Sequence, residues 1–90
     1  MAAYRVLIKA SAGKELERLG TKSDRTRIVQ RIQALALDPR SRGCEKLAGY
    51  ADRYRIRQGS YRIVYPVDDQ RLEVTIFKIG DRKDVYRQVV

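Results

Sequence analysis

The chain has 90 residues, of which 43% are apolar, so it is long enough for one globular domain with one modest core. It carries 20 Lys and Arg against 11 Asp and Glu, a net charge of +9, which points to a polyanionic partner: nucleic acid, an acidic protein or an anionic membrane. One cysteine and no histidine exclude an internal disulfide, the usual general base and the commonest metal ligand.

These counts predict one domain over residues 1–90 with no metal and no cofactor. No apolar run approaches the roughly 20 residues that cross a bilayer, and the first ten residues lack the pattern of a secretory signal. We therefore expect a soluble cytoplasmic protein without membrane contact.

The N-terminal third predicts a strand followed by two helices. Residues 4–10 are rich in β-forming side chains. Ser11 is expected to cap a helix over residues 12–19, and Gly20 to end it. Because a second helix follows closely, the two are expected to form an antiparallel pair.

The second helix is expected to begin at Ser23 or Asp24 and to run to about Leu37, where Asp38 and Pro39 stop it. Its apolar residues recur every three or four positions and predict one buried face. They are Ile28, Ile32 and Leu35.

The sequence after the second helix is typical of β strands. A short strand is expected within residues 44–50, and longer strands over residues 54–58, 61–67 and 72–79, with Gly80 closing the last. Two helices followed by such strands predict the α+β class: an antiparallel sheet with the helix pair packed on one face. The other face is then left for solvent or a partner.

The hairpin "YRIRQGSYRIVY" has a predicted face and register. A two-residue type II′ turn at Gly59–Ser60 places Arg57 opposite Arg62. Because side chains alternate along a strand, one face is apolar and the other basic. The apolar face carries Tyr54, Ile56, Ile63 and Tyr65, and the basic face carries Arg55, Arg57, Arg62 and Val64.

The next turn, with Asp69–Gln70 at its tip, extends both faces. It predicts that Val67 lies opposite Leu72, Ile63 opposite Ile76, and Arg62 opposite Phe77. An aromatic ring would then lie beside the arginines. Arg62 is expected to be exposed.

Like charges opposite each other repel, so the facing Arg57 and Arg62 destabilise the hairpin unless an anion lies between them. A guanidinium matches phosphate oxygens, which favours a phosphate-binding face. The alternative is a solvated face whose arginines pair with Glu73 or Asp84.

A second basic segment follows Gly80. It could fold back over the basic face and bring Arg82, Lys83 and Tyr86 there. Tyr86 would then stack on a base or donate a hydrogen bond; equally, it would pack on the core.

The segment "KLAGYADRYRIRQGSYRIVYPVDDQRLEVTIFKIGDRKDVYR" resembles the C-terminal half of the RelE/ParE toxin superfamily, through K-L-x-G, Y-R-I-R, Y-R-I-V-Y and I-G-x-R-x-x-V-Y. The resemblance implies a RelE-like fold and a toxin of a type II toxin–antitoxin pair, with a cognate antitoxin as its partner. In the RelE branch, the toxin enters the ribosomal A site and cuts mRNA without a metal. The RNA's own 2′-OH attacks the adjacent phosphate.

The resemblance also implies site residues. Those implied as catalytic are Arg55, Arg57, Arg62, Arg82 and Tyr86. We expect the residues that bind RNA to be Arg55, Arg57, Phe77, Lys83 and Arg87.

Two positions depart from the family pattern. Some RelE toxins have lysines where this chain has Arg55 and Arg57, and arginine is a poor general base. Asp81 stands where many relatives have histidine. Two alternatives therefore stay open: a ParE-like inhibitor of DNA gyrase without RNase activity, and a non-catalytic basic module that binds RNA or an antitoxin.

Overall fold

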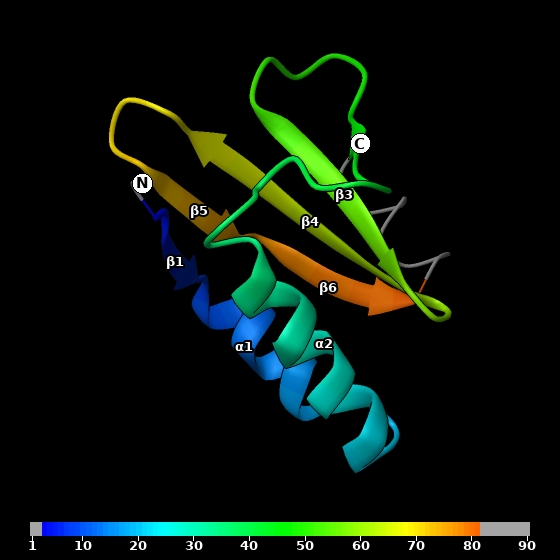
Figure 1. Ribbon diagram of the computed structural model, residues 1–90. Coiled ribbons are helices and arrows are strands. Elements are labelled where there is room, and N and C mark those ends of the chain that lie inside the picture. The colour runs from blue at the N-terminus through cyan, green and yellow to red at the C-terminus, as the bar shows by residue number, and fades with distance from the viewer. Residues whose placement is uncertain (1–2, 82–90) are drawn as a thin grey trace.

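Two helices cover one face of a six-stranded sheet in the computed structural model, which describes residues 3–81 (Figure 1). The helices are α1 (Ala10–Glu17) and α2 (Lys22–Ala34). The strands are β1 (Arg5–Ile8), β2 (Glu45–Lys46), β3 (Arg53–Gln58), β4 (Tyr61–Asp68), β5 (Glu73–Ile76) and β6 (Lys78–Asp81). The predicted α+β class is confirmed. No helix within the described residues is both long and apolar enough to cross a membrane.

The strands lie in the order β1-β5-β4-β3-β2, and β6 lies beside β4. The neighbours from β2 to β6 pair antiparallel, as predicted. In contrast, β1 pairs parallel with β5, with Val6 opposite Val74, so the complete sheet is mixed. Parallel neighbours need a long connection, which the helices and the other strands supply here.

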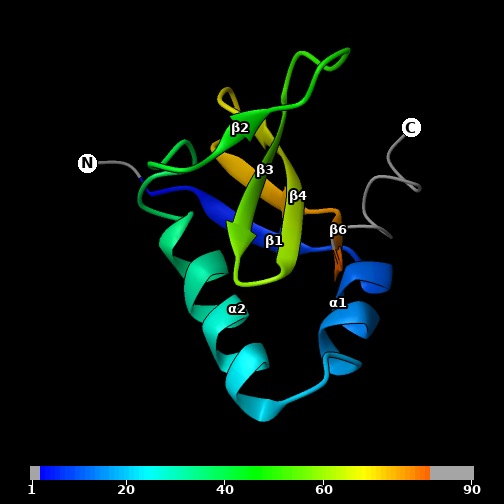
Figure 2. The ribbon, with the colours of Figure 1, turned by 90° about the vertical axis from the view of Figure 1, so that its right-hand side faces the viewer.

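The helices form the predicted antiparallel pair, joined by a short linker (Figure 2). Both begin earlier than expected. Lys9 precedes α1 without a side-chain cap, so the predicted cap at Ser11 is wrong. Thr21 caps α2: its hydroxyl oxygen accepts a hydrogen bond from the backbone N–H of Asp24 at 3.0 Å. Thr21 thus satisfies one of the free N–H groups of the first turn.

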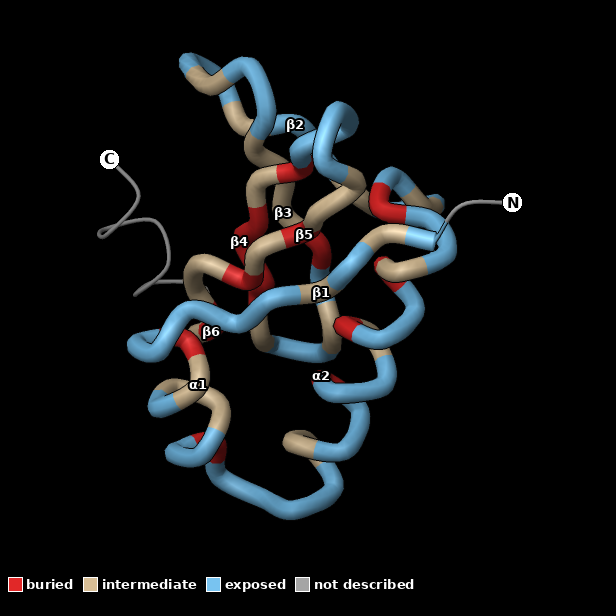
Figure 3. Tube along the Cα trace, turned by 90° about the vertical axis from the view of Figure 1, so that its left-hand side faces the viewer, coloured by how far each residue is buried: buried red, intermediate tan, exposed pale blue. Residues whose placement is uncertain are grey.

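The core lies between the helices and the sheet, and buried positions gather there in Figure 3. The helices contribute Ala12, Leu19, Ile28, Ile32 and Leu35, as the spacing of their apolar residues predicted. The sheet contributes Ile56, Ile63, Tyr65, Val67, Val74, Ile76 and Ile79. The apolar face of the hairpin is therefore the face that meets the helices.

The hairpin register is confirmed: Arg57 lies opposite Arg62, and Ile56 opposite Ile63. Gly59, at the turn, has φ +62°, and Ser60 does not have a positive φ. A type II′ turn requires this combination.

The register beyond β4 differs from the prediction. Val67 pairs with Val74, not Leu72. The turn is longer because the Asp68 carboxylate accepts hydrogen bonds from the backbone N–H groups of Gln70 and Arg71, both at 3.0 Å. These bonds hold a wider turn than the two residues expected at its tip.

An extra residue at Phe77 shifts the pairing once more. Its N–H donates to the carbonyl oxygen of Val64 at 2.9 Å, and Lys78 also lies opposite Val64. Two residues opposite one form a β-bulge. As a result, Ile63 faces Ile79, not Ile76, and Arg62 faces Gly80, not Phe77.

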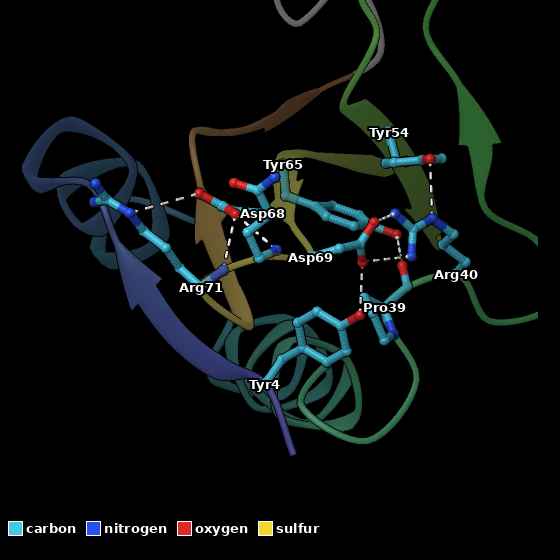
Figure 4. A network of polar contacts seen from close by, with 9 residues as sticks. Tyr4, Pro39, Arg40, Tyr54, Tyr65, Asp68, Asp69 and Arg71 are labelled. Carbon is cyan, nitrogen blue, oxygen red and sulfur yellow. Dashed lines mark hydrogen bonds and ion pairs between the residues drawn. The ribbon is translucent and has the colours of Figure 1, made fainter. Parts of the chain in front are cut away.

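A polar network outside the core joins the loop after α2 to the turn after β4 (Figure 4). Tyr4 donates a hydrogen bond to the Asp69 carboxylate at 2.6 Å. Arg40 donates two to the same carboxylate, at 3.1 and 2.7 Å, and one to the hydroxyl of Tyr54 at 2.9 Å. Hydrogen bonding to Arg40, with a further bond from Tyr4, holds the pKa of Asp69 below its usual value.

Asp69→Asn is expected to lower the free energy of unfolding at pH 7 and to have a smaller effect near pH 2. A carboxyl whose pKa is depressed by folding stabilises the fold above its unfolded value of about 4, and this contribution is lost as pH falls through the folded value. Urea unfolding at both pH values measures it. Asp52→Asn is the control, because that carboxylate makes no hydrogen bond or ion pair within residues 3–81. An equal loss of stability at both pH values would contradict the prediction.

Candidate functional site

The strands β3 and β4 carry arginines on the side of the sheet that faces away from the helices. Arg55 lies opposite Val64, and Arg57 opposite Arg62. Arg53 has the same parity along β3 and faces Pro66. We call Arg53, Arg55, Arg57, Arg62 and Val64 the basic face. The structure thus brings three of the predicted site residues together, Arg55, Arg57 and Arg62.

Arg62 is buried, with 6% of its surface exposed, so the expected exposure of this residue is wrong. It lies in the central strand β4, between Arg57 on one side and Gly80, which has no side chain, on the other. Among the described residues it is the one charged side chain that is buried.

The Arg62 guanidinium has few acceptors. It donates one hydrogen bond, to the backbone carbonyl of Tyr61 at 3.3 Å, and it forms no ion pair within residues 3–81. Buried charges are normally paired, because removing them from water is costly. A bound anion would supply the missing acceptor.

Arg57, directly across the ladder, is exposed and has no carboxylate partner in the described part of the chain. The expected alternative partner Glu73 forms its ion pair with Arg5 at the far edge of the sheet. The other alternative partner, Asp84, lies outside the described residues. The like charges of Arg57 and Arg62 therefore face each other without a bridging carboxylate from residues 3–81.

Arg55 differs from its neighbours because it has an acidic partner that the sequence pattern did not reveal. It forms an ion pair with Glu45 of β2 at 2.8 Å. The hydrogen bond from Arg55 holds the pKa of Glu45 below its usual range, and the nearby charges of Arg57 and Arg62 lower it further. Glu45 therefore stays ionised beside the basic face.

Phe77 lies at the other end of the basic face from its predicted place. The guanidinium carbon of Arg53 is 4.8 Å from the centre of its ring, and the Lys9 ammonium is 4.2 Å from it. Arg53 also lies 4.5 Å from the ring centre of Tyr50. Arg53 was missed from the sequence because the predicted strand began at residue 54. With β3 beginning at Arg53, alternation from Arg55 and Arg57 places it on the basic face.

The remaining predicted site residues, Arg82, Lys83, Tyr86 and Arg87, lie outside the described residues. Strand β6 continues through Gly80, where the sequence predicted its end, to Asp81 opposite Tyr61. The backbone thus leaves the described part next to the position of Arg62. Within residues 3–81, no group of Cys, Asp and Glu is arranged to hold a metal ion.

This arrangement can bind and stabilise a multiply charged anion, but its arginines are not general bases, because arginine does not lose its proton. The basic face is also not an enclosed pocket. Two apolar hollows in the described structure lie beside α2 instead, one lined by Leu16, Thr26 and Val29 and one by Val6, Ile8 and Ile32.

Known proteins match this chain over nearly its whole length. The family described as the ParE toxin of type II toxin–antitoxin systems, parDE, matches residues 6–86. Toxin RelG of Mycobacterium tuberculosis is 26% identical over 85 residues, which are 94% of this chain and 98% of that protein.

Solved structures agree with the fold. A free double mutant of E. coli toxin RelE is 30% identical, with a TM-score of 0.79 over 96% of this chain and 93% of that one. The archaeal RelE–RelB complex from Pyrococcus horikoshii holds a chain that is 32% identical, with a TM-score of 0.79 over 89% of this chain and 96% of that one. With the family match, these likenesses show that the protein belongs to the RelE/ParE superfamily of toxins from type II toxin–antitoxin systems.

Proposed function

We propose that this toxin is a metal-independent endoribonuclease that cuts mRNA in the ribosomal A site. The observation that supports this most is Arg62: a buried guanidinium without a carboxylate partner in residues 3–81, directly opposite the equally unpaired Arg57. Two such groups match a phosphate whose negative charge grows during the reaction, and preorganised charges of this kind are among the largest contributions to catalysis.

The proposed reaction uses the RNA as its own nucleophile. The 2′ oxygen forms a bond to the adjacent phosphorus, the bond from phosphorus to the 5′ oxygen breaks, and a 2′,3′-cyclic phosphate remains. The 2′-OH loses a proton and the departing 5′ oxygen gains one. Arg57 and Arg62 hold the phosphate oxygens, and Arg55 adds positive charge beside them.

The proton acceptor must lie elsewhere, because an arginine is a poor base. In this proposal Tyr86 or a group of ribosomal RNA takes the proton of the 2′-OH. Arg82 assists the departing oxygen, and Phe77, Lys83 and Arg87 contact the RNA.

We further propose that an antitoxin protein binds the toxin and masks the basic face. The relatives support this: their solved structures include RelE–RelB complexes from E. coli and P. horikoshii. The toxin would act in the cytoplasm, where it meets translating ribosomes. Co-expression with the antitoxin is expected to relieve growth arrest.

A second candidate function is inhibition of DNA gyrase, as in the ParE branch. The observation that favours it is the family match itself, which carries the ParE name. The third reading is a basic module that binds RNA or an antitoxin without cutting.

Primer extension on ribosome-bound mRNA, together with a gyrase supercoiling assay, separates these functions. Discrete cuts at the A-site codon are the expected result. Inhibited supercoiling with intact mRNA would favour the ParE function, and neither effect would leave the binding module.

A further inference from the structure

We propose that Arg53, whose guanidinium lies over the rings of Tyr50 and Phe77, binds a backbone phosphate of the transcript two linkages away from the one being cut. This subsite rests on the proposed RNase function and extends it, because it assigns a contact to a part of the substrate that does not react.

Two aromatic rings contact the Arg53 guanidinium. Its central carbon lies 4.5 Å from the ring centre of Tyr50 and 4.8 Å from that of Phe77. Tyr50 comes from the loop before β3, and Phe77 from the bulge between β5 and β6, so three separate segments meet here. The Lys9 ammonium, 4.2 Å from the centre of the Phe77 ring, adds a second positive charge.

The rings lie over the guanidinium carbon and do not accept hydrogen bonds from its N–H groups. A guanidinium has five N–H donors along its edge. Arg53 donates none of them to a hydrogen-bond acceptor or a carboxylate within residues 3–81. An arginine side chain that two rings already restrain loses less conformational entropy on binding an oxygen anion than a free side chain would lose.

The position of Arg53 along β3 suits the second phosphate from the one being cut. Arg53, Arg55 and Arg57 share one face, and residues two apart on a strand are separated by about 6.6 Å. This step is close to the spacing of successive phosphates along an extended single strand. With the scissile phosphate between Arg57 and Arg62, Arg53 lies two such steps away, beyond Arg55 and its partner Glu45.

A purely structural role for Arg53 would explain its contacts with the two rings, but it would leave the N–H donors of the guanidinium unused. The attraction between a cation and an aromatic ring is present whether or not RNA is bound. An experiment can separate the structural role of Arg53 from phosphate binding, because only phosphate binding depends on the charge of the RNA.

The test is single-turnover cleavage of ribosome-bound mRNA that carries one neutral methylphosphonate at a linkage near the cut. The two linkages on each side of the scissile phosphate are replaced in turn. The wild-type protein is expected to be slowed about 10- to 100-fold by the replacement at one of them, the loss of a charge-assisted hydrogen bond.

Arg53→Gln is expected to cut natural mRNA more slowly than the wild type by a similar factor. The methylphosphonate at the sensitive linkage should not slow this variant any further. Such non-additivity identifies a direct contact. Arg53→Lys, which keeps the charge, should recover part of the rate. Arg71→Gln, at an exposed arginine of the distant turn, should behave as the wild type. Thermal unfolding checks that each variant is folded, and Phe77→Leu, which removes one ring, serves as the second variant.

If the effects of Arg53→Gln and of the neutral linkage multiply at all four positions, the subsite is wrong although the RNase function stands. The same holds if Arg53→Gln weakens antitoxin binding alone and cuts at the wild-type rate. If the wild-type protein cuts no mRNA, it is the proposed function that fails.

Discussion

Arg62→Met is expected to reduce mRNA cleavage by about 100-fold or more while leaving the protein at least as stable as the wild type. The expected cause is the loss of one of the two guanidiniums that we propose to hold the scissile phosphate, because removing a preorganised donor of this kind costs about 10²–10³-fold in rate. The stability is kept because methionine retains the unbranched apolar stem that fills the space beside Gly80.

We expect Arg62→Met to be as stable as the wild type or more stable. Arg62 is 6% exposed and has no carboxylate partner in the described residues, and replacing buried charges by apolar side chains of similar volume is often neutral or stabilising. The variant also removes the repulsion from Arg57 across the ladder. Opposite signs for activity and stability are typical of a charge that is retained for function.

Two measurements check this prediction: urea unfolding of the purified variant, and primer extension on ribosome-bound mRNA. Arg71→Met is the matched control, because its arginine is exposed and lies in the turn after β4. It should change neither quantity by much. Normal cleavage by Arg62→Met would remove this residue from the site, and a large loss of stability would show that its charge is satisfied in the free protein.

The faces of the hairpin could be predicted because they depend on local chemistry. A glycine at the first position of a two-residue turn sets the register, and alternation then decides which side chains share a face. The register of the next strand was wrong by two residues, as the Val67–Val74 pair shows. The faces survived this error because a shift of two restores the parity.

The bulge at Phe77 could not be predicted, because nothing in the apolar pattern marks the extra residue. With the two-residue shift at the preceding turn, it places Gly80 opposite Arg62, while the Phe77 ring contacts Arg53. Arg62 lies in a central strand, between β3 and β6, as the predicted strand order had it. Its burial was missed because burial depends on how the surrounding segments pack, which the local sequence does not encode.

Contacts between distant segments were missed for the same reason. The ion pair of Arg55 with Glu45 needs β2 to pair with β3, and the stack on Arg53 needs the Tyr50 loop and the bulge to meet. The site residues beyond residue 81 were predicted from the second basic segment and from the family resemblance, and the described structure does not test them.

Ile63→Ala is expected to lower the free energy of unfolding by about 2–5 kcal/mol, the usual range for truncating a buried isoleucine. Ile63 is fully buried at the centre of β4, between Ile56 and Ile79 on the face that meets the helices. The same truncation at Ile8, which is 46% exposed, is the control and should cost much less. Urea unfolding measures both. Equal losses at the two positions would contradict the assigned faces, and with them the orientation of Arg62, since neighbours along a strand point to opposite sides.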